Sequence, residues 1–361
     1  MRKGARVLLE RKAGFRRALL AWYRRERRDL SWRGVLDPYV VWVTEVMLQQ
    51  TRVEQGTPYF ERFRALFPSV EALAAAKEDQ VLKAWEGLGY YSRARNIHKA
   101  AKAVVGERGS VFPDTAAEWR TLPGVGPYTA GAIASIAFGR NEPAVDGNVK
   151  RVLARLTRLR ESIDDAKAGK ELWALAGALV KGGSPGDFNQ GLMELGAQVC
   201  VPRNALCGEC PVSKYCGAAA AGDQDALPLR RPKKPVPRRE LVIAAVKKNG
   251  RYLLGRRPPD GMLGGLWEFP GGKAELGESD TTALRRELKE KLGIEVEVGE
   301  LAATVNHAYS HFKVMLRVYR CAHVEGKAAP RVHSELKWVL PRDFSDYAFP
   351  GANHKFLGLL G

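Results

Sequence analysis

The chain has 361 residues, which is enough for two domains or three. Hydrophobic residues make up 45% and charged residues 27%, as in an ordinary globular protein, and no apolar run is long enough to cross a membrane. Fifty-eight Lys and Arg stand against 40 Asp and Glu, which gives a net charge of +18. This balance favours a nucleic-acid partner, because neutralised phosphates release their counterions, although a generally basic proteome would produce the same charge.

Residues 1–28 are rich in arginine, as transit peptides are. They also contain the acidic residues Glu10 and Glu26, which transit peptides avoid. Apolar residues recur at helical spacing at Phe15, Leu19, Trp22 and Tyr23. We therefore expect a first helix packed on the core, with no export signal ahead of it, and a cytoplasmic protein.

The two halves of the chain differ in their hydrophobic patterning. Residues 1–221 place apolar residues three and four apart, which predicts an all-α domain. Residues 240–361 carry short strand-like runs, and Leu241–Val246 and Tyr252–Leu254 flank an Asn-Gly turn, which predicts a hairpin in an α+β domain. Residues 222–239 are basic and proline-rich, so we expect a linker there.

A glycine-rich turn lies inside the helical half. Thr115 and Glu118 have the spacing of a capping box, so a helix should begin there and run into Leu122-Pro-Gly-Val-Gly126. Pro127 is suited to open a second helix, and Gly139 to end it, so the hairpin spans 115–139. The residues that would present the turn to phosphate are Leu122, Gly124, Val125 and Gly126. A plain helix–turn–helix connection is the alternative.

Two carboxylates stand out from their surroundings. Glu45 interrupts the nearly continuous apolar run of residues 40–48, and an acidic residue there needs a partner or a task. Burial would keep Glu45 protonated, whereas Asp146, in a short polar turn, would stay ionised. Two carboxylates with different environments suit the cleavage of a glycosidic bond. The alternatives are an ion pair of Glu45 with Arg33 or Arg52, and an ordinary Asp-Gly turn.

These segments together resemble the helix-hairpin-helix DNA glycosylase superfamily. Residues 122–126 are similar to its hairpin, and Glu45 to Val53 is similar to the motif that carries the catalytic glutamate of adenine DNA glycosylases. The resemblance implies that Glu45 protonates the adenine and that Asp146 stabilises the cationic sugar. Tyr128 and Asn148 would assist Asp146.

The same resemblance implies a set of residues around an extruded base, since the target atom is unreachable inside a duplex. Gln50 and Tyr90 would fill space beside the flipped nucleotide, and Gln190 would hydrogen-bond the adenine edge. Arg33 and Leu48 belong to the same expected base-binding set.

Tyr128 separates two related families. Endonuclease III-type enzymes, which excise oxidised pyrimidines and cut the strand, carry a nucleophilic lysine at this place after the hairpin. A tyrosine hydroxyl cannot form a Schiff base with the sugar, so strong lyase activity is not expected. A pyrimidine glycosylase/lyase is nevertheless kept as an alternative.

Four cysteines fall within a short segment. They are Cys200, Cys207, Cys210 and Cys216. Four thiolates complete either a zinc site or an iron–sulfur site, and a single CxxC pair is unusual for zinc modules. The spacing resembles the [4Fe–4S] loop of the glycosylase superfamily, which implies a [4Fe–4S] cluster with a structural or DNA-positioning role.

Residues 267–294 resemble the Nudix box of enzymes that hydrolyse nucleoside diphosphate derivatives, with a helix expected at Thr281–Leu292. The match departs at Lys291, where that family has an acidic residue, and a cationic lysine opposes metal binding. We therefore expect a Nudix-like fold without efficient hydrolysis. Adenine glycosylases use such a domain to recognise 8-oxoguanine, and a loop resembling theirs implies that lesion contacts come from Tyr309, Ser310 and His311.

The resemblance covers nearly the whole chain and predicts an enzyme that removes adenine opposite 8-oxoguanine or guanine in double-stranded DNA. We expect a monomer with no membrane association that works at the nucleoid. Two further alternatives are a Nudix hydrolase fused to a DNA-binding domain and a non-catalytic DNA- or metal-binding protein.

Overall fold

The computed structural model describes residues 2–232 and 235–361, so Lys233 and Lys234 of the predicted linker lie outside the described residues. Contacts divide the chain into two compact units, Met1–Arg52 with Ala100–Lys233, and Val53–Lys99 with Lys234–Gly361. This division differs from the predicted boundaries at 221 and 240, because residues 53–99 pack with the C-terminal half. The domain boundaries inferred from the sequence, at residues 221 and 240, stay a prediction.

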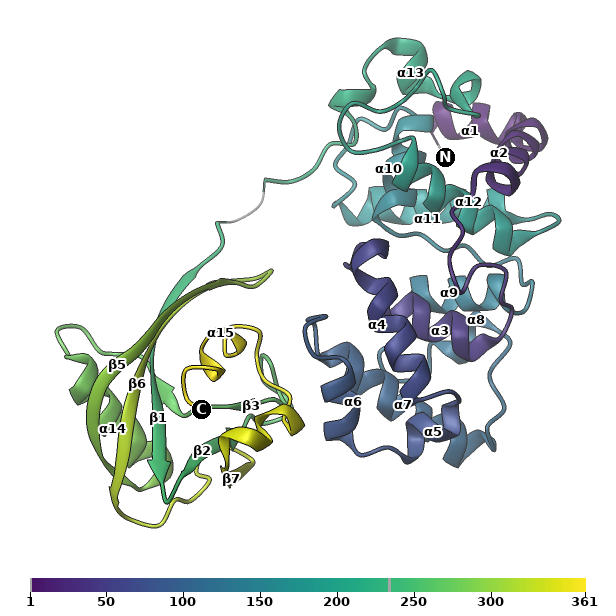
Figure 1. Ribbon diagram of the computed structural model, residues 1–361. Coiled ribbons are helices and arrows are strands. Elements are labelled where there is room, and N and C mark those ends of the chain that lie inside the picture. The colour runs from purple at the N-terminus through teal and green to yellow at the C-terminus, as the bar shows by residue number, and fades with distance from the viewer. Residues whose placement is uncertain (1, 233–234) are drawn as a thin grey trace. The chain divides into compact units, whose positions relative to one another are not determined.

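Unit 1 is helical, as expected (Figure 1). Its helices are α1 (Lys3–Glu10), α2 (Lys12–Glu26), α3 (Pro38–Met47), the second part of α7 (Ser92–Arg108), α8 (Ala116–Trp119), α9 (Pro127–Ile136), α10 (Gly147–Leu156), α11 (Ala166–Val180), α12 (Pro185–Gln198) and α13 (Gly217–Ala221), with 3-10 turns η1 (Ser213–Tyr215) and η2 (Gln224–Ala226). The predicted N-terminal helix is confirmed, since α2 buries Phe15, Leu19, Trp22 and Tyr23 in the core of this unit. None of the described helices is long and apolar enough to cross a membrane.

Helices α3 and α9 pack against each other. Asp37 caps α3 by accepting from the N–H of Tyr39, and Pro38 opens the helix. Most of the other α3 side chains are buried, so Glu45 is held in an apolar setting. Helix α9 begins at Pro127, as predicted, but ends at Ile136, three residues before Gly139.

Helices α10 and α12 approach each other closely. A Cβ added at Gly196 of α12 would lie 2.7 Å from the Cβ of Asn148 on α10, so only glycine fits there. Asp146 is the N-cap residue of α10, and its carboxylate accepts from the N–H of Val149 at 2.7 Å. This cap fixes the place of Asp146 at the start of α10.

Unit 2 combines helices with one mixed sheet. Its helices are α4 (Val53–Leu66), α5 (Val70–Ala75), α6 (Glu78–Ala84), the first part of α7, α14 (Asp280–Leu292) and α15 (His354–Leu357), with the 3-10 helix η3 (Pro341–Asp346). The strands are β1 (Arg238–Lys248), β2 (Arg251–Arg256), β3 (Trp267–Glu268), β4 (Gly271–Gly272), β5 (Glu295–Ala308), β6 (Lys313–Glu325) and β7 (Glu335–Val339). The sheet order is β3-β2-β1-β6-β5, with β4 paired to β1 and β7 paired to β2.

The predicted hairpin is confirmed as the antiparallel pair β1–β2. Strand β1 also pairs in parallel with β6, and it begins at Arg238, so the last two residues of the predicted linker belong to the sheet. Both faces of β1 are apolar because both are covered. Val242, Ala244 and Val246 face the core of α14, whereas Ala245 faces a second core that contains Phe349.

Candidate active site

Glu45 and Tyr128 meet between α3 and α9. The Tyr128 hydroxyl donates to Glu45 Oε2 at 2.5 Å and lies 3.2 Å from the sulfur of Met193 on α12. Among the described ion pairs, Glu45 has none with Arg33 or Arg52. The hydrogen-bond partner of the Glu45 carboxyl group is therefore Tyr128. A neutral hydroxyl satisfies the carboxyl group without fixing its charge.

Burial raises the pKa of Glu45, and the nearby charge of Asp146 adds to the effect. The hydrogen bond from Tyr128 and the charge of Arg33 oppose this rise without cancelling it. Burial and the Glu45 carboxylate raise the pKa of Tyr128 well above its ordinary value. Tyr128 is therefore a neutral donor, and Glu45 keeps its proton to higher pH than an exposed glutamate.

Asp146 differs from the expectation of an unperturbed, ionised carboxylate. Burial raises its pKa as well, although the N–H of Val149, the charge of Arg151 and hydrogen bonds from Asn148 all lower it. The contrast between the two carboxylates is therefore smaller than predicted. The anion at Asp146 is favoured by the N-terminus of α10 rather than by exposure to solvent.

Asn148 is held by Arg151, one turn along α10. The Arg151 guanidinium donates to Asn148 Oδ1 at 2.8 Å, to the carbonyl of Gly196 at 2.7 Å and to the carbonyl of Cys200 at 2.8 Å. One buried arginine thus connects the Asp146 turn to the segment where the cysteines begin.

The glycine-rich hairpin forms as predicted, with Thr115 capping α8. Gly124 is exposed and has φ +74°, which favours glycine. Leu122 and Val125 have buried side chains, and the Val125 N–H is bonded to the Leu122 carbonyl. Leu122 and Val125 therefore support the turn from within, and Gly124 is exposed at its surface.

The sequence of the chain is similar to proteins of known families. The chain matches the family models for an HhH-GPD superfamily base excision DNA repair protein over residues 43–177 and for a NUDIX domain over residues 241–359. It is 36% identical to the adenine DNA glycosylase of Homo sapiens, over 94% of this chain and 73% of that protein. The chain belongs to the adenine DNA glycosylase family.

Two further comparisons agree with this assignment. The adenine DNA glycosylase of Buchnera aphidicola subsp. Acyrthosiphon pisum is 36% identical, over 82% of this chain and 83% of that protein. The solved structure of a thermostable thymine-DNA glycosylase aligns with a TM-score of 0.53 and 30% identity, covering 59% of this chain and 98% of that structure. The predicted fold, a helical glycosylase followed by a Nudix-like domain, is confirmed.

The protein is thus a DNA-binding, base-excision repair enzyme that hydrolyses the glycosidic bond of adenine. Adenine DNA glycosylases match it across both halves, which favours this function over a pyrimidine glycosylase/lyase and over a Nudix hydrolase with an added DNA-binding domain.

Arg33 and Gln190, both predicted to contact the base, also contact each other through a short hydrogen bond from the guanidinium to Gln190 Oε1. Arg33 further pairs with Glu194 at 3.1 Å, and Glu194 pairs with Arg28 at 2.7 Å. Glu194 and Arg28 were not predicted. The available signal for Glu194 is its place between apolar residues 192–193 and 195, although α12 also carries Asp187.

Gln50 and Tyr90, the residues predicted to fill space beside the flipped nucleotide, share an uncommon backbone conformation. Their φ angles are +57° and +47°, in the left-handed region that side-chain-bearing residues rarely adopt. Such strain concentrates at functional sites. Leu48 ends α3 as its C-cap residue and is half-buried.

The predicted lesion-reading residues lie in the turn between β5 and β6. The Tyr309 N–H donates to the Phe312 carbonyl at 2.8 Å, and the two rings stack with their centroids 4.7 Å apart. Tyr309 therefore anchors the turn to the core, with its hydroxyl 3.2 Å from the N–H of Ala352. Ser310 and His311 are exposed and are the side chains that can meet a ligand.

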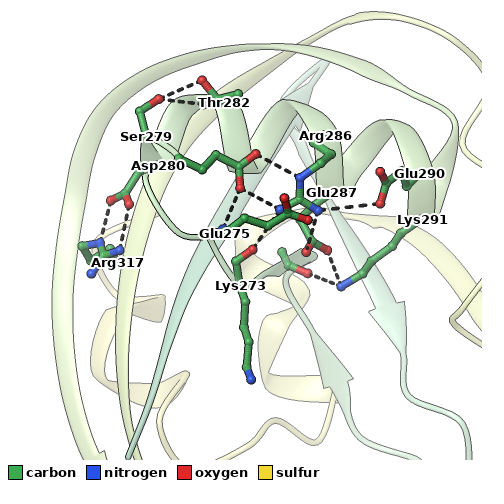
Figure 2. Close-up of polar contacts among 12 residues, drawn as sticks. Lys273, Glu275, Ser279, Asp280, Thr282, Arg286, Glu287, Glu290, Lys291 and Arg317 are labelled. Carbon is green, nitrogen blue, oxygen red and sulfur yellow. Dashed lines mark hydrogen bonds and ion pairs between the residues drawn. The ribbon is translucent and has the colours of Figure 1, made fainter.

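The Nudix-like segment carries a network of charges on α14 (Figure 2). Arg286 pairs with Glu278 at 2.8 Å, with Glu287 at 3.3 Å and with Glu290 at 3.7 Å. Lys291 turns its ammonium onto the buried carboxylate of Glu287 at 2.5 Å and donates to the Gly271 carbonyl at 2.8 Å. The Lys291 ammonium thus contacts both the Glu287 carboxylate and the Gly271 carbonyl.

The four cysteines line one cavity in the loops that follow α12, together with apolar side chains such as Val152, Leu195 and Val212. Within the described part of the chain, no three His, Cys, Asp or Glu side chains are close enough to hold a single ion. Thiols spread around a shared cavity suit a bulky cluster better than zinc, whose sulfur ligands lie at about 2.3 Å. Fully buried Arg155, which was not predicted, donates to Cys200 Sγ at 3.3 Å.

Proposed function

We propose that this adenine DNA glycosylase removes adenine paired with 8-oxoguanine, and with guanine, from duplex DNA. The observation that carries the chemistry is the hydrogen bond from Tyr128 to the half-buried Glu45, with the charge of Asp146 near enough to raise the pKa of both. A protonated acid beside a second carboxylate is the arrangement that glycosidic cleavage requires.

In the proposed mechanism, Glu45 donates its proton to a ring nitrogen of the extruded adenine while the bond from the base to the sugar breaks. The bonding electrons leave with the adenine, and the positive charge that develops on the sugar is stabilised by Asp146. Water then adds to the sugar carbon, and its proton passes to a carboxylate and on to solvent. Tyr128 and Asn148 hold the two carboxylates in place.

The residue after the hairpin supports hydrolysis without strand cleavage. Tyr128 stands where a lyase would carry its lysine, and its raised pKa keeps the hydroxyl neutral. We expect an abasic site as the product, with the strand intact.

We assign recognition of the base opposite adenine to the turn between β5 and β6, with Ser310 as the donor or acceptor and His311 beside it. Support comes from the exposure of both side chains and from the anchoring of the turn by Tyr309. Around the adenine we assign Arg33, Gln190, Leu48, Gln50 and Tyr90.

Enzymes of this family typically carry an iron–sulfur cluster. We propose that Cys200, Cys207, Cys210 and Cys216 hold a [4Fe–4S] cluster here, which would order the loop and present it to DNA. The shared cavity and the guanidinium of Arg155 beside Cys200 support this, because a cation stabilises thiolates. We expect the enzyme to act as a monomer.

Single-turnover excision on three duplexes tests the proposal: adenine opposite 8-oxoguanine, adenine opposite guanine, and thymine glycol opposite adenine, each scored with and without alkali. We expect alkali-dependent cleavage at adenine, fastest opposite 8-oxoguanine. Alkali-independent nicking at thymine glycol would contradict the assignment of Tyr128, and equal rates opposite both purines would contradict lesion reading.

A further inference from the structure

The loop that carries Tyr90, residues 87–91 between α6 and α7, is tightly braced within unit 2. Three of its residues have positive φ angles, +91° at Gly87, +74° at Gly89 and +47° at Tyr90. The Trp85 indole donates to the Gly89 carbonyl at 3.0 Å, and the Arg93 guanidinium donates to the same carbonyl at 3.2 Å while lying 5.3 Å from the Tyr90 ring centroid. The neighbouring side chains thus hold Tyr90 in its unusual conformation.

Glu86, immediately before this loop, accepts bonds from a distant part of unit 2. Its Oε1 accepts from the Phe349 N–H at 2.8 Å and pairs with His354 at 3.0 Å, and its Oε2 pairs with Lys83 at 2.6 Å. Lys83 also donates to the Tyr347 carbonyl at 3.0 Å. The Glu86 side chain is only 14% exposed, so one enclosed carboxylate joins α6 to the segment 347–354.

The surroundings of Glu86 keep its carboxyl group in the charged form. Burial raises its pKa, but the bonds from His354, Lys83 and the Phe349 N–H outweigh burial and leave the pKa lowered. Glu86 is therefore an anion at neutral pH. A carboxylate with three donors is a strong fixed point, since charge-assisted hydrogen bonds are the stronger kind.

Two further contacts link the loop of Tyr90 to the C-terminal half of the chain. The Tyr91 hydroxyl accepts from the Gly87 N–H at 3.1 Å and lies 3.5 Å from the Phe349 carbonyl. The His311 ring meets the Tyr90 ring edge to face, with centroids 5.7 Å apart. Tyr90, predicted to lie beside the flipped nucleotide, therefore contacts the turn predicted to read the opposite base.

We propose that Glu86 is a positioning residue for lesion recognition. By holding the segment 347–354 against α6, it fixes the loop of Tyr90 relative to the turn of Ser310 and His311, and so sets the preference for 8-oxoguanine over guanine opposite adenine. Glu86 touches neither base and takes no part in the chemistry. The inference rests on the proposed function, in which that turn reads the opposite base.

The test uses the full-length enzyme with Glu86→Ala and Glu86→Gln, in single-turnover excision opposite 8-oxoguanine and opposite guanine. Glu86→Ala should lower the ratio of the two rates by about tenfold, the equivalent of about 1.4 kcal/mol, while excision opposite guanine stays within about twofold. Glu86→Gln keeps one acceptor for the Phe349 N–H and should fall between. Glu300→Ala, which removes an exposed carboxylate paired with Arg320, is the matched control and should leave the ratio unchanged.

His354→Ala removes the ion pair with Glu86 from the histidine side and should also lower the ratio of the two excision rates. The double variant His354→Ala, Glu86→Ala should lower that ratio less than the sum of the two single effects. His354→Ala and Glu86→Gln carry the test if Glu86→Ala does not fold. Equal loss on both duplexes would mean a merely structural role and would overturn the inference. So would an unchanged ratio in an enzyme whose preference falls with Ser310→Ala; if Ser310→Ala also leaves the ratio unchanged, the proposed function fails first and the inference with it.

Discussion

The raised pKa of Glu45 results from the side chains around it. Glu45 lies in a helix whose other side chains are nearly all buried, and its partner is a hydroxyl that cannot neutralise it. Burial therefore decides its pKa, which is raised. A general acid works only while it is protonated, so the excision rate should persist above the usual range of a carboxyl group and fall as the pH rises through the pKa of Glu45.

Tyr128→Phe tests this assignment. The hydrogen bond from Tyr128 lowers the pKa of Glu45, so its removal should raise that pKa further and move the falling limb of the pH–rate profile to higher pH. Single-turnover rates measured across the neutral range would show the shift. Tyr319→Phe, which removes a hydroxyl bonded to Asp280 in the Nudix-like domain, should leave the profile in place. A limb that stays put, or moves to lower pH, would mean that another group titrates.

A single functional residue stands out in a sequence when it conflicts with its local pattern. Glu45 among valines was such a conflict, whereas Glu194 conflicts less with its surroundings because α12 also carries Asp187 and several amide side chains. The pairing of Glu194 with Arg28 and Arg33 joins residues more than 160 positions apart, so no local pattern contains it. The raised pKa of Asp146 was not predicted for the same reason, since a short Asp-Gly turn gives no indication of how the rest of the chain packs around it.

At the level of elements, α14 keeps the shape of a Nudix helix while one lysine changes its charge. Lys291→Glu would remove the ammonium from the buried Glu287 and place a third carboxylate near Glu287 and Glu290. Oxygen ligands of this kind, with the carbonyl of Gly271, suit a hard divalent cation. We expect the variant to gain binding of Mn²⁺ and to lose about 1–3 kcal/mol of stability without it, because a buried acceptor is left unpaired.

Isothermal titration with Mn²⁺, together with thermal melts with and without the ion, would measure both effects. Lys289→Glu makes the same charge change on the exposed side of α14, where Lys289 pairs with Glu295, and should bind no ion. Binding by both variants, or by neither, would show that Lys291 does not hold the place of a cation.

The proposed [4Fe–4S] cluster would order the loops that carry the four cysteines. Cys210→Ser should lose iron and acid-labile sulfide and should weaken DNA binding, because the loop would lose the cluster that orders it. Iron analysis and the visible absorption of the purified protein would show the loss. Cys321→Ser, at a buried position of β6 far along the chain, is the control and should keep its iron. Full iron content in Cys210→Ser would remove that residue from the ligand set.

Elements with strong local signals were predictable, whereas their pairing was not. The β1–β2 hairpin followed from its Asn-Gly turn, and the helix expected at Thr281–Leu292 is α14, which begins one residue earlier. The parallel pairing of β1 with β6 joins strands far apart in the sequence, and nothing local specifies it. The covered second face of β1 was visible only as an unbroken apolar run, which a buried helix would also give.

On the scale of the whole molecule, the contacts cross the boundary that composition suggested. Residues 53–99 pack with the C-terminal half, through Glu86 and through Arg256, which pairs with Glu78 and Asp79. Loss of the C-terminal half therefore removes partners from residues 53–99 as well as the turn proposed to read the lesion.

Truncation after Pro232 tests this view. The shortened enzyme should still excise adenine opposite guanine, but it should lose its preference for 8-oxoguanine and melt at a lower temperature than the full chain. Single-turnover excision and a thermal melt on the same preparation would measure both. A truncated enzyme that prefers the lesion as strongly as the full chain would place lesion reading in the helical half.

The most direct test of the central claim, that Glu45 supplies the proton, is single-turnover excision of adenine opposite 8-oxoguanine by Glu45→Gln, with binding to the same duplex measured in parallel. Gln fills the same space and can still accept from Tyr128, so binding should stay within about twofold while excision falls by roughly 10²–10⁴-fold or more. Excision near the rate of the unaltered enzyme would contradict the account, because another group would then have to protonate the adenine.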